Sequence, residues 1–231
     1  TSSVLPSSIP VIGSSYQGGI VFYMDDSLGL GLIAAPTNQS NAMMPFPTGT
    51  GAEWGCDVIN IAGADGITIG TGAQNTLDIV NANCWSNNPG KLIAANICDT
   101  LTLGGYGDWF LPSRDELYEM YLNIGSDFNS TIGNVLGLGN LGGFDEHYYW
   151  SSSEYNLTRA WNVLFANGNN VLDCDKGEHD RHVRAIRAFN YQPLTILGTT
   201  NSLTVSTSGW NYILVTDSLG CTAMDSVYVI V

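Results

Sequence analysis

The chain has 231 residues, of which 44% are hydrophobic and only 12% are charged, and its formal net charge is −14. A chain of this length can bury a large core, so we expect one domain, or one domain with a small module. Only seven residues are Lys or Arg, which excludes the basic surface needed to bind nucleic acid or an anionic membrane. Cations, neutral glycans and other proteins remain as partner classes.

Because charges are few, Asn, Ser, Thr and Gly must supply the polar surface. This balance is typical of secreted and cell-surface proteins. No stretch of the sequence approaches 18 consecutive apolar residues, so no membrane-spanning segment is predicted. We therefore expect an extracellular protein, either at a cell surface or in a secreted fibre.

The first third of the chain predicts an arm, a hairpin and long loops. Residues 1–15 are rich in Ser and Pro and are interpreted as an extended N-terminal arm of the kind left after processing. Two short apolar runs, 19–24 and 30–35, flank a polar turn and predict a β-hairpin. Residues 37–75 are rich in Gly, Asn and Thr and are expected to form surface loops. Apolar spacing then predicts helices within 76–83 and 90–101.

A third helix is predicted to begin inside "GGYGDWFLPSRDELYEMY", where three carboxylates lie close together. Ser113 and Glu116 have the spacing of a capping box, with Ser113 as the N-cap. Asp115 and Glu116 also lie in the first turn, where carboxylates complement the positive end of the helix dipole. Catalytic carboxylate pairs usually come from different elements. Structural capping is therefore favoured over acid–base catalysis.

The second half of the chain returns to strand-like patterns over 148–155, 159–169, 169–175 and 182–189. Residues 191–231 alternate apolar and polar positions, which predicts three or four antiparallel strands in a separate β module. The fold class expected from these elements is α+β, with two to three helices and long loops, followed by a small all-β unit.

The five cysteines form no Cys-x-x-Cys pair, which argues against zinc ribbons and thioredoxin-type redox chemistry. In an exported protein, two disulfides and one remaining thiol are expected, and four paired cysteines allow three connectivities. Cys56 with Cys84 is the preferred pair because both flank the same loop-rich segment. Cys98 lies in a helical pattern and is interpreted as buried. No cysteine is expected to sit in a basic neighbourhood that would favour a thiolate.

Three segments carry a resemblance to a known family: Gly105–Leu117, Tyr149–Glu154 and Arg181–Phe189. Residues 16–190 resemble the C-terminal domain of the collagen-like bacterial adhesins, the Lcl C-terminal domain, and related bacterial surface lipoproteins. The resemblance implies a C-type-lectin-like fold and an extracellular binding domain, often a homo-oligomer, with glycan-type ligands. It does not imply an enzyme, and no catalytic residues are predicted.

The C-terminal segment carries a second resemblance. Residues 199–231 are similar to the immunoglobulin-like repeats of surface adhesins from Bacteroidetes-type bacteria. Only the C-terminal half of such a repeat is present, and Cys221 has no obvious mate in its own module. The predicted domains are therefore an arm at 1–15, a lectin-like domain at 16–190 and a partial immunoglobulin-like module at 191–231.

Two groups of residues are candidate binding sites. The loops of the second half offer Trp and Asn side chains, which suit the ring faces and hydroxyl groups of sugars, at the position where related lectin-like folds bind ligands. This ligand set is Asn156, Arg159, Trp161, Asn162, Asn167, Asn169 and Asn170. Trp150 is interpreted as a core residue.

The metal hypothesis is Ca²⁺, because hard oxygen ligands cluster around a Gly turn within residues 173–182. The ligand set is Asp173, Asp175, Glu178 and Asp180. A solvated acidic loop without metal is the favoured alternative, since the Glu that closes a full calcium loop is absent. No cofactor is required.

Two compatible functions follow. The first is a structural or adhesive subunit of a bacterial surface or fibre, which self-associates through the N-terminal arm and the incomplete β module. The second is an adhesin domain that binds a glycan or a protein through the lectin-like loop face.

Overall fold

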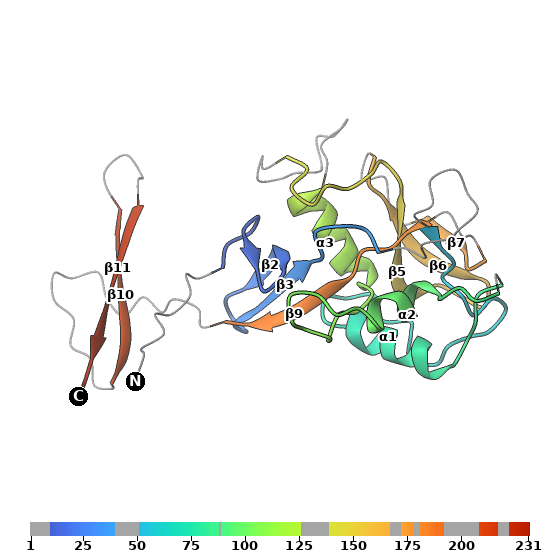
Figure 1. Ribbon diagram of the computed structural model, residues 1–231, viewed down its shortest axis with the longest axis horizontal. Coiled ribbons are helices and arrows are strands. Elements are labelled where there is room, and N and C mark those ends of the chain that lie inside the picture. The colour runs from blue at the N-terminus through green and yellow to red at the C-terminus, as the bar shows by residue number, and fades with distance from the viewer. Residues whose placement is uncertain are drawn as a thin grey trace. The chain divides into compact units, whose positions relative to one another are not determined.

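The structure is a computed structural model, which describes residues 10–39, 51–87, 89–125, 139–166, 172–177, 181–191, 208–216 and 222–231. The chain divides into two compact units, Thr1–Tyr191 and Gln192–Val231. In its described part, the first unit combines three helices with sheets of four and five strands (Figure 1). The predicted mixed α+β class is therefore confirmed.

The first sheet joins the beginning and the end of the first unit. Its strands are antiparallel, in the order β1-β2-β3-β9. Their bounds are β1 Ser15–Tyr16, β2 Gly19–Asp25, β3 Leu30–Ala34 and β9 Ile186–Asn190. The predicted hairpin corresponds to β2 and β3. Gly31 lies opposite Phe189, and a Cβ atom there would lie 2.2 Å from the Phe189 ring, so glycine lets this ring cover β3.

The second sheet has the order β4-β8-β5-β6-β7, and only the β5–β8 pair is parallel. The bounds of its strands are β4 Gly51–Ala52, β5 Tyr148–Glu154, β6 Arg159–Leu164, β7 Leu172–Asp175 and β8 Arg181–His182. The antiparallel pairing of β5 with β6 shifts register between Trp150 and Glu154. This irregular stretch contains three buried serines whose hydroxyls bond neighbouring segments.

The three helices are α1 Gly72–Asn81, α2 Ala94–Asp99 and α3 Arg114–Ile124. Helix α3 contacts β2 of the first sheet and β5 and β6 of the second, so it links the two sheets (Figure 1). Helix α1 packs against α2 and β5. No helix among the described residues is long and apolar enough to cross a lipid bilayer.

The core is built around tryptophans, two of which connect distant segments. The Trp54 indole donates to Ser151 O at 2.8 Å, and the Trp150 indole donates to Ala52 O at 2.8 Å. Both rings are fully buried, which confirms the core role predicted for Trp150. The prediction that all of residues 37–75 form surface loops is wrong, because residues 51–56 are buried against β5 through these bonds.

The second unit contains one described antiparallel pair, β10 Gly209–Thr216 and β11 Thr222–Val229. The two strands pair along their whole length, from Gly209 with Val229 to Thr216 with Thr222. Three or four strands were predicted for this module, and the described part contains two. Residues 192–207 and 217–221, including Cys221, lie outside the described residues.

Candidate functional site

The carboxylates at the start of α3 serve helix structure. The Ser113 hydroxyl accepts from Glu116 N, and the Glu116 carboxylate accepts from Ser113 N at 2.7 Å, which together form the predicted capping box. Arg114 pairs with Asp115 at 2.7 Å on the same turn. Each carboxylate of this turn therefore has a structural partner, as expected for a helix start.

Glu116 also serves a second helix, which the sequence did not predict. Its carboxylate accepts from Gly70 N at 2.8 Å and from Gly72 N, where α1 begins. The N-cap of α1, Thr71, makes no side-chain capping bond of its own. The buried Glu116 carboxylate thus accepts hydrogen bonds from backbone N–H groups at the N-termini of both helices. Burial raises the pKa of Glu116 above its usual value, and the backbone donors oppose this shift only in part.

The predicted ligand face falls on the hairpin of β5 and β6, and only part of it is available. The Asn156 oxygen accepts from Thr158 N and Arg159 N, each at 3.0 Å, so this side chain stabilises its own turn. Asn162 is only 1% exposed, so its assignment to a surface site is wrong. Arg159 is exposed at the start of β6. Asn167, Asn169 and Asn170 lie outside the described residues.

Trp161 is the centre of a surface cluster that we call the aromatic platform, made of Arg114, Tyr155 and Trp161. The Tyr155 and Trp161 rings meet edge to face, with their centroids 4.9 Å apart. The Arg114 guanidinium lies 5.3 Å from the centroid of the Trp161 ring, and the Asp115 carboxylate fixes its position. Tyr155 is 50% exposed. The platform therefore presents a prearranged aromatic surface to solvent.

The predicted calcium loop is only partly described. The Asp175 carboxylate accepts from Gly177 N at 2.9 Å, which stabilises the turn after β7. Asp57, from a distant loop, approaches the same glycine, where a Cβ atom would lie 3.9 Å from its carboxylate. Only the backbone of Asp173 is described, and Glu178 and Asp180 lie outside the described residues. Within the described ranges, no group of three or more acidic, His or Cys side chains is arranged to hold a metal.

The same turn contains one member of a buried ion pair, which was not predicted. The Lys176 ammonium pairs with Glu154, and both side chains are nearly inaccessible. The ammonium also donates to Ile59 O at 2.8 Å and lies 4.7 Å from the centroid of the Trp54 ring. The Glu154 carboxylate in turn accepts from Ile61 N at 3.1 Å. The pair therefore fastens the 59–61 loop to the end of β5.

A second buried cation organises the opposite end of the second sheet. Arg184 donates to Ala35 O at 2.9 Å and Gly142 O at 2.6 Å, and lies 4.1 Å from the centroid of the Phe144 ring. Burial lowers the pKa of Arg184 to about 10. The guanidinium also donates to Asn38 Oδ1 at 2.6 Å, which turns the Asn38 amide nitrogen toward His182.

Among the described residues, the cysteines form one disulfide, and Cys98 and Cys174 are free thiols, so the expected second disulfide is not found in this part of the chain. The disulfide between Cys56 and Cys84 is present, as preferred from the sequence. Cys98 is buried, and burial raises the pKa of its thiol. The expectation that no cysteine has a basic neighbour is wrong for Cys174. Its sulfur lies 3.0 Å from the Arg181 guanidinium, which reaches it from β8, seven positions along the chain.

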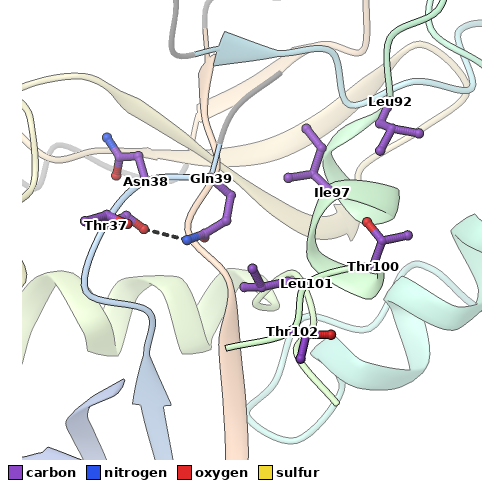
Figure 2. A pocket seen from close by; sticks show the side chains of 8 residues that line it. All are labelled: Thr37, Asn38, Gln39, Leu92, Ile97, Thr100, Leu101 and Thr102. Carbon is purple, nitrogen blue, oxygen red and sulfur yellow. Dashed lines mark hydrogen bonds between the residues drawn. The ribbon is translucent and has the colours of Figure 1, made fainter. Parts of the chain in front are cut away.

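One surface hollow, of about 430 Å³, lies between the exit of β3 and α2. Figure 2 shows the Gln39 amide pointing toward Thr37 and bonded to Thr37 O at 2.6 Å. Its wall combines uncharged hydrogen-bonding side chains with aliphatic ones and contains no ionisable group. The lining residues are Thr37, Asn38, Gln39, Leu92, Ile97, Thr100, Leu101 and Thr102.

Most cations of the chain are paired with aromatic rings. Five of the seven Lys and Arg residues lie over aromatic rings, at 3.8 to 5.3 Å from the ring centroids. The other two are Lys91, which is half-buried, and Arg159, which is exposed. A surface that keeps so few cations offers little to phosphate or sulfate groups.

Comparison with known proteins leaves the family open, since no family model matches the chain and no curated protein sequence is significantly similar to it.

Proposed function

We propose that the chain is an extracellular subunit of a bacterial surface or fibre, with a structural or adhesive role, which self-associates. The observation that carries this proposal is the second unit, where the described part is a single two-stranded ribbon. A two-stranded ribbon gains stability when further strands pair with it, and a second copy can supply such strands. The lectin-like and immunoglobulin-like assignments, and the arm at residues 1–15, belong to this proposal.

The charge distribution and the disulfide support an exported binding protein. A disulfide persists in an oxidising compartment and is rare in cytosolic proteins, which agrees with the pair at Cys56 and Cys84. The small number of surface cations disfavours a partner rich in phosphate or sulfate groups. The carboxylates of α3, which offered the clearest catalytic alternative, are engaged in helix capping. Binding is therefore favoured over catalysis.

The test is the assembly state of the purified full chain, measured by light scattering and electron microscopy. We expect oligomers or filaments, and we expect deletion of residues 192–231 to convert them to monomers. Deletion of residues 1–14 tests the arm separately. Circular dichroism of each product establishes that the first unit remains folded. A full chain that stays monomeric at all concentrations contradicts the proposal.

The aromatic platform favours a second function, binding of a glycan or a protein through the loop face. Aromatic rings stack on the apolar faces of sugars, and the Arg114 and Asp115 side chains offer hydrogen bonds beside the ring. The test is a glycan array with the wild type and with Trp161→Ala. Trp85→Ala is the matched control, because Trp85 is 74% exposed but lies outside the platform. Equal binding by the wild type and both variants, or no binding at all, contradicts this function.

A further inference from the structure

Strands at sheet edges expose unpaired backbone groups, and proteins commonly protect such edges with charged residues, with proline or by keeping the strand short. In the described sheets, most edge strands follow this rule. β9 contains Arg187, β7 contains Asp173 and Asp175, and β11 contains Asp225. β1 and β4 have no charge but only two residues each. These five strands are therefore poor templates for pairing with another chain.

β10 is the exception. Its eight residues, "GWNYILVT", contain no charged residue and no proline. One edge of β10 pairs with β11 along all eight residues, and the other edge pairs with no strand among the described residues. Its composition is rich in aromatic and β-branched residues, which favour strands and, at low charge, favour strand addition.

From these observations we propose that β10 pairs with β10 of a second copy, antiparallel and about a two-fold axis, to form a continuous four-stranded sheet. This inference rests on the proposed self-association and identifies its interface. The charge of the chain favours a second copy as the partner that pairs with the edge of β10 that faces away from β11. The chain has a net charge of −14, so contacts between acidic segments of two copies are repulsive, whereas pairing of two β10 strands brings no charged side chains together.

The symmetry of this pairing makes a specific geometric demand. A two-fold axis perpendicular to the sheet requires that one residue of β10 lies directly opposite its own counterpart. Neighbouring strands are about 4.8 Å apart, and a disulfide needs Cα atoms roughly 4.4 to 6.8 Å apart. The two β11 strands would lie three strand spacings apart, about 14 Å. A single cysteine can therefore form a disulfide between copies from β10 but not from β11.

The experiment is a cysteine scan of the full chain in a background of Cys98→Ala, Cys174→Ala and Cys221→Ala. One cysteine at a time replaces each position of β10, and each position of β11 serves as its matched control. We expect a cross-linked dimer from one β10 position, at least about tenfold more abundant than from any β11 position, because only β10 meets the distance limit. Variants that lose wild-type circular dichroism are set aside, and the remaining positions decide the result.

The other outcomes separate this inference from the proposed function. Cross-linking from β11 alone overturns the choice of β10. No cross-linking from either strand, in a chain that light scattering shows to be oligomeric, overturns the β10 interface and leaves self-association in place. The same result is expected if a segment of the chain itself covers β10. A monomeric chain overturns both proposals.

Discussion

The buried pair of Lys176 and Glu154 allows a quantitative test of how the loops are held. The substitution is Lys176→Met, which keeps the length of the side chain and removes its charge. In the wild type, the ammonium has three oxygen partners, Glu154 Oε1, Ile59 O and Leu157 O. After the substitution, the Glu154 carboxylate remains buried with Ile61 N as its donor.

The magnitude follows from the burial of both groups. Removing one partner of a buried ion pair leaves an uncompensated charge and costs about 3–5 kcal/mol of unfolding free energy. Replacing both partners with apolar groups of similar size is often neutral or stabilising. Lys176→Met is therefore expected to be strongly destabilising, and adding Glu154→Leu to it is expected to recover most of the loss.

The assay is guanidinium unfolding of the wild type, the two single variants and the double variant, followed by circular dichroism. The double-mutant cycle then gives the coupling between the two side chains. Arg159→Met is the matched control, because Arg159 is exposed, and it is expected to change stability by less than about 0.5 kcal/mol. A loss below about 1 kcal/mol for Lys176→Met, or additive single effects, refutes the assignment of a structural role to the pair.

Further predictions concern the caps, the disulfide and the surface charge. Burial raises the folded-state pKa of Glu116 above its ordinary value of 4.5. The stability that this shift contributes is therefore present in full at pH values below the unfolded-state pKa and is lost as the pH rises through the folded-state pKa. The free energy of unfolding of Glu116→Gln, measured across this pH range, should not show that loss. Gly72→Ala would place a Cβ atom 2.2 Å from Glu116 Oε2 and should cost about 1–3 kcal/mol, whereas Gly107→Ala, whose nearest contact is at 3.8 Å, should be neutral in the same melts. Replacing Cys56 and Cys84 with Ala opens a loop with a sequence separation of 28 and should cost about 3–4 kcal/mol by loop entropy, with no loss refuting a stabilising role. Higher salt should strengthen self-association, as measured by light scattering, because salt screens the repulsion between acidic copies; weakening by salt would contradict this.

The features that the sequence predicted well are those set by neighbours along the chain. The capping box depends on Ser113 and Glu116, which are three residues apart, and the hairpin of β2 and β3 depends on two apolar runs around a turn. The same information could not show that Glu116 reaches Gly70, 46 positions away. That contact depends on how α1 and α3 pack, which no local pattern records.

The candidate site shows the same division. Trp161 was selected for its chemistry and does lie in a surface cluster, but Arg114, which covers its ring, comes from a different element. Asn162 was selected for the same reason as its neighbours, namely an amide side chain that suits sugar hydroxyl groups. It points into the core, because alternation along β6 puts it on the other face from Trp161. Composition therefore identified the hairpin, and strand geometry decided which side chains were available.

Three arginines near the end of the first unit pair with aromatic rings, so they link the packing of the aromatic residues to the acidic character of the surface. Arg181, Arg184 and Arg187 follow each other at a spacing of three, which does not keep them on one face of a strand. Each guanidinium lies over a different ring, that of Tyr148, Phe144 or Tyr106 respectively. Arginine binds aromatic faces and carbonyl groups together, so these side chains fasten the two sheets and the 103–110 turn from inside. The chain keeps an excess of carboxylates, so like-charge repulsion opposes contacts between acidic segments of two copies and does not oppose pairing of uncharged strands such as β10.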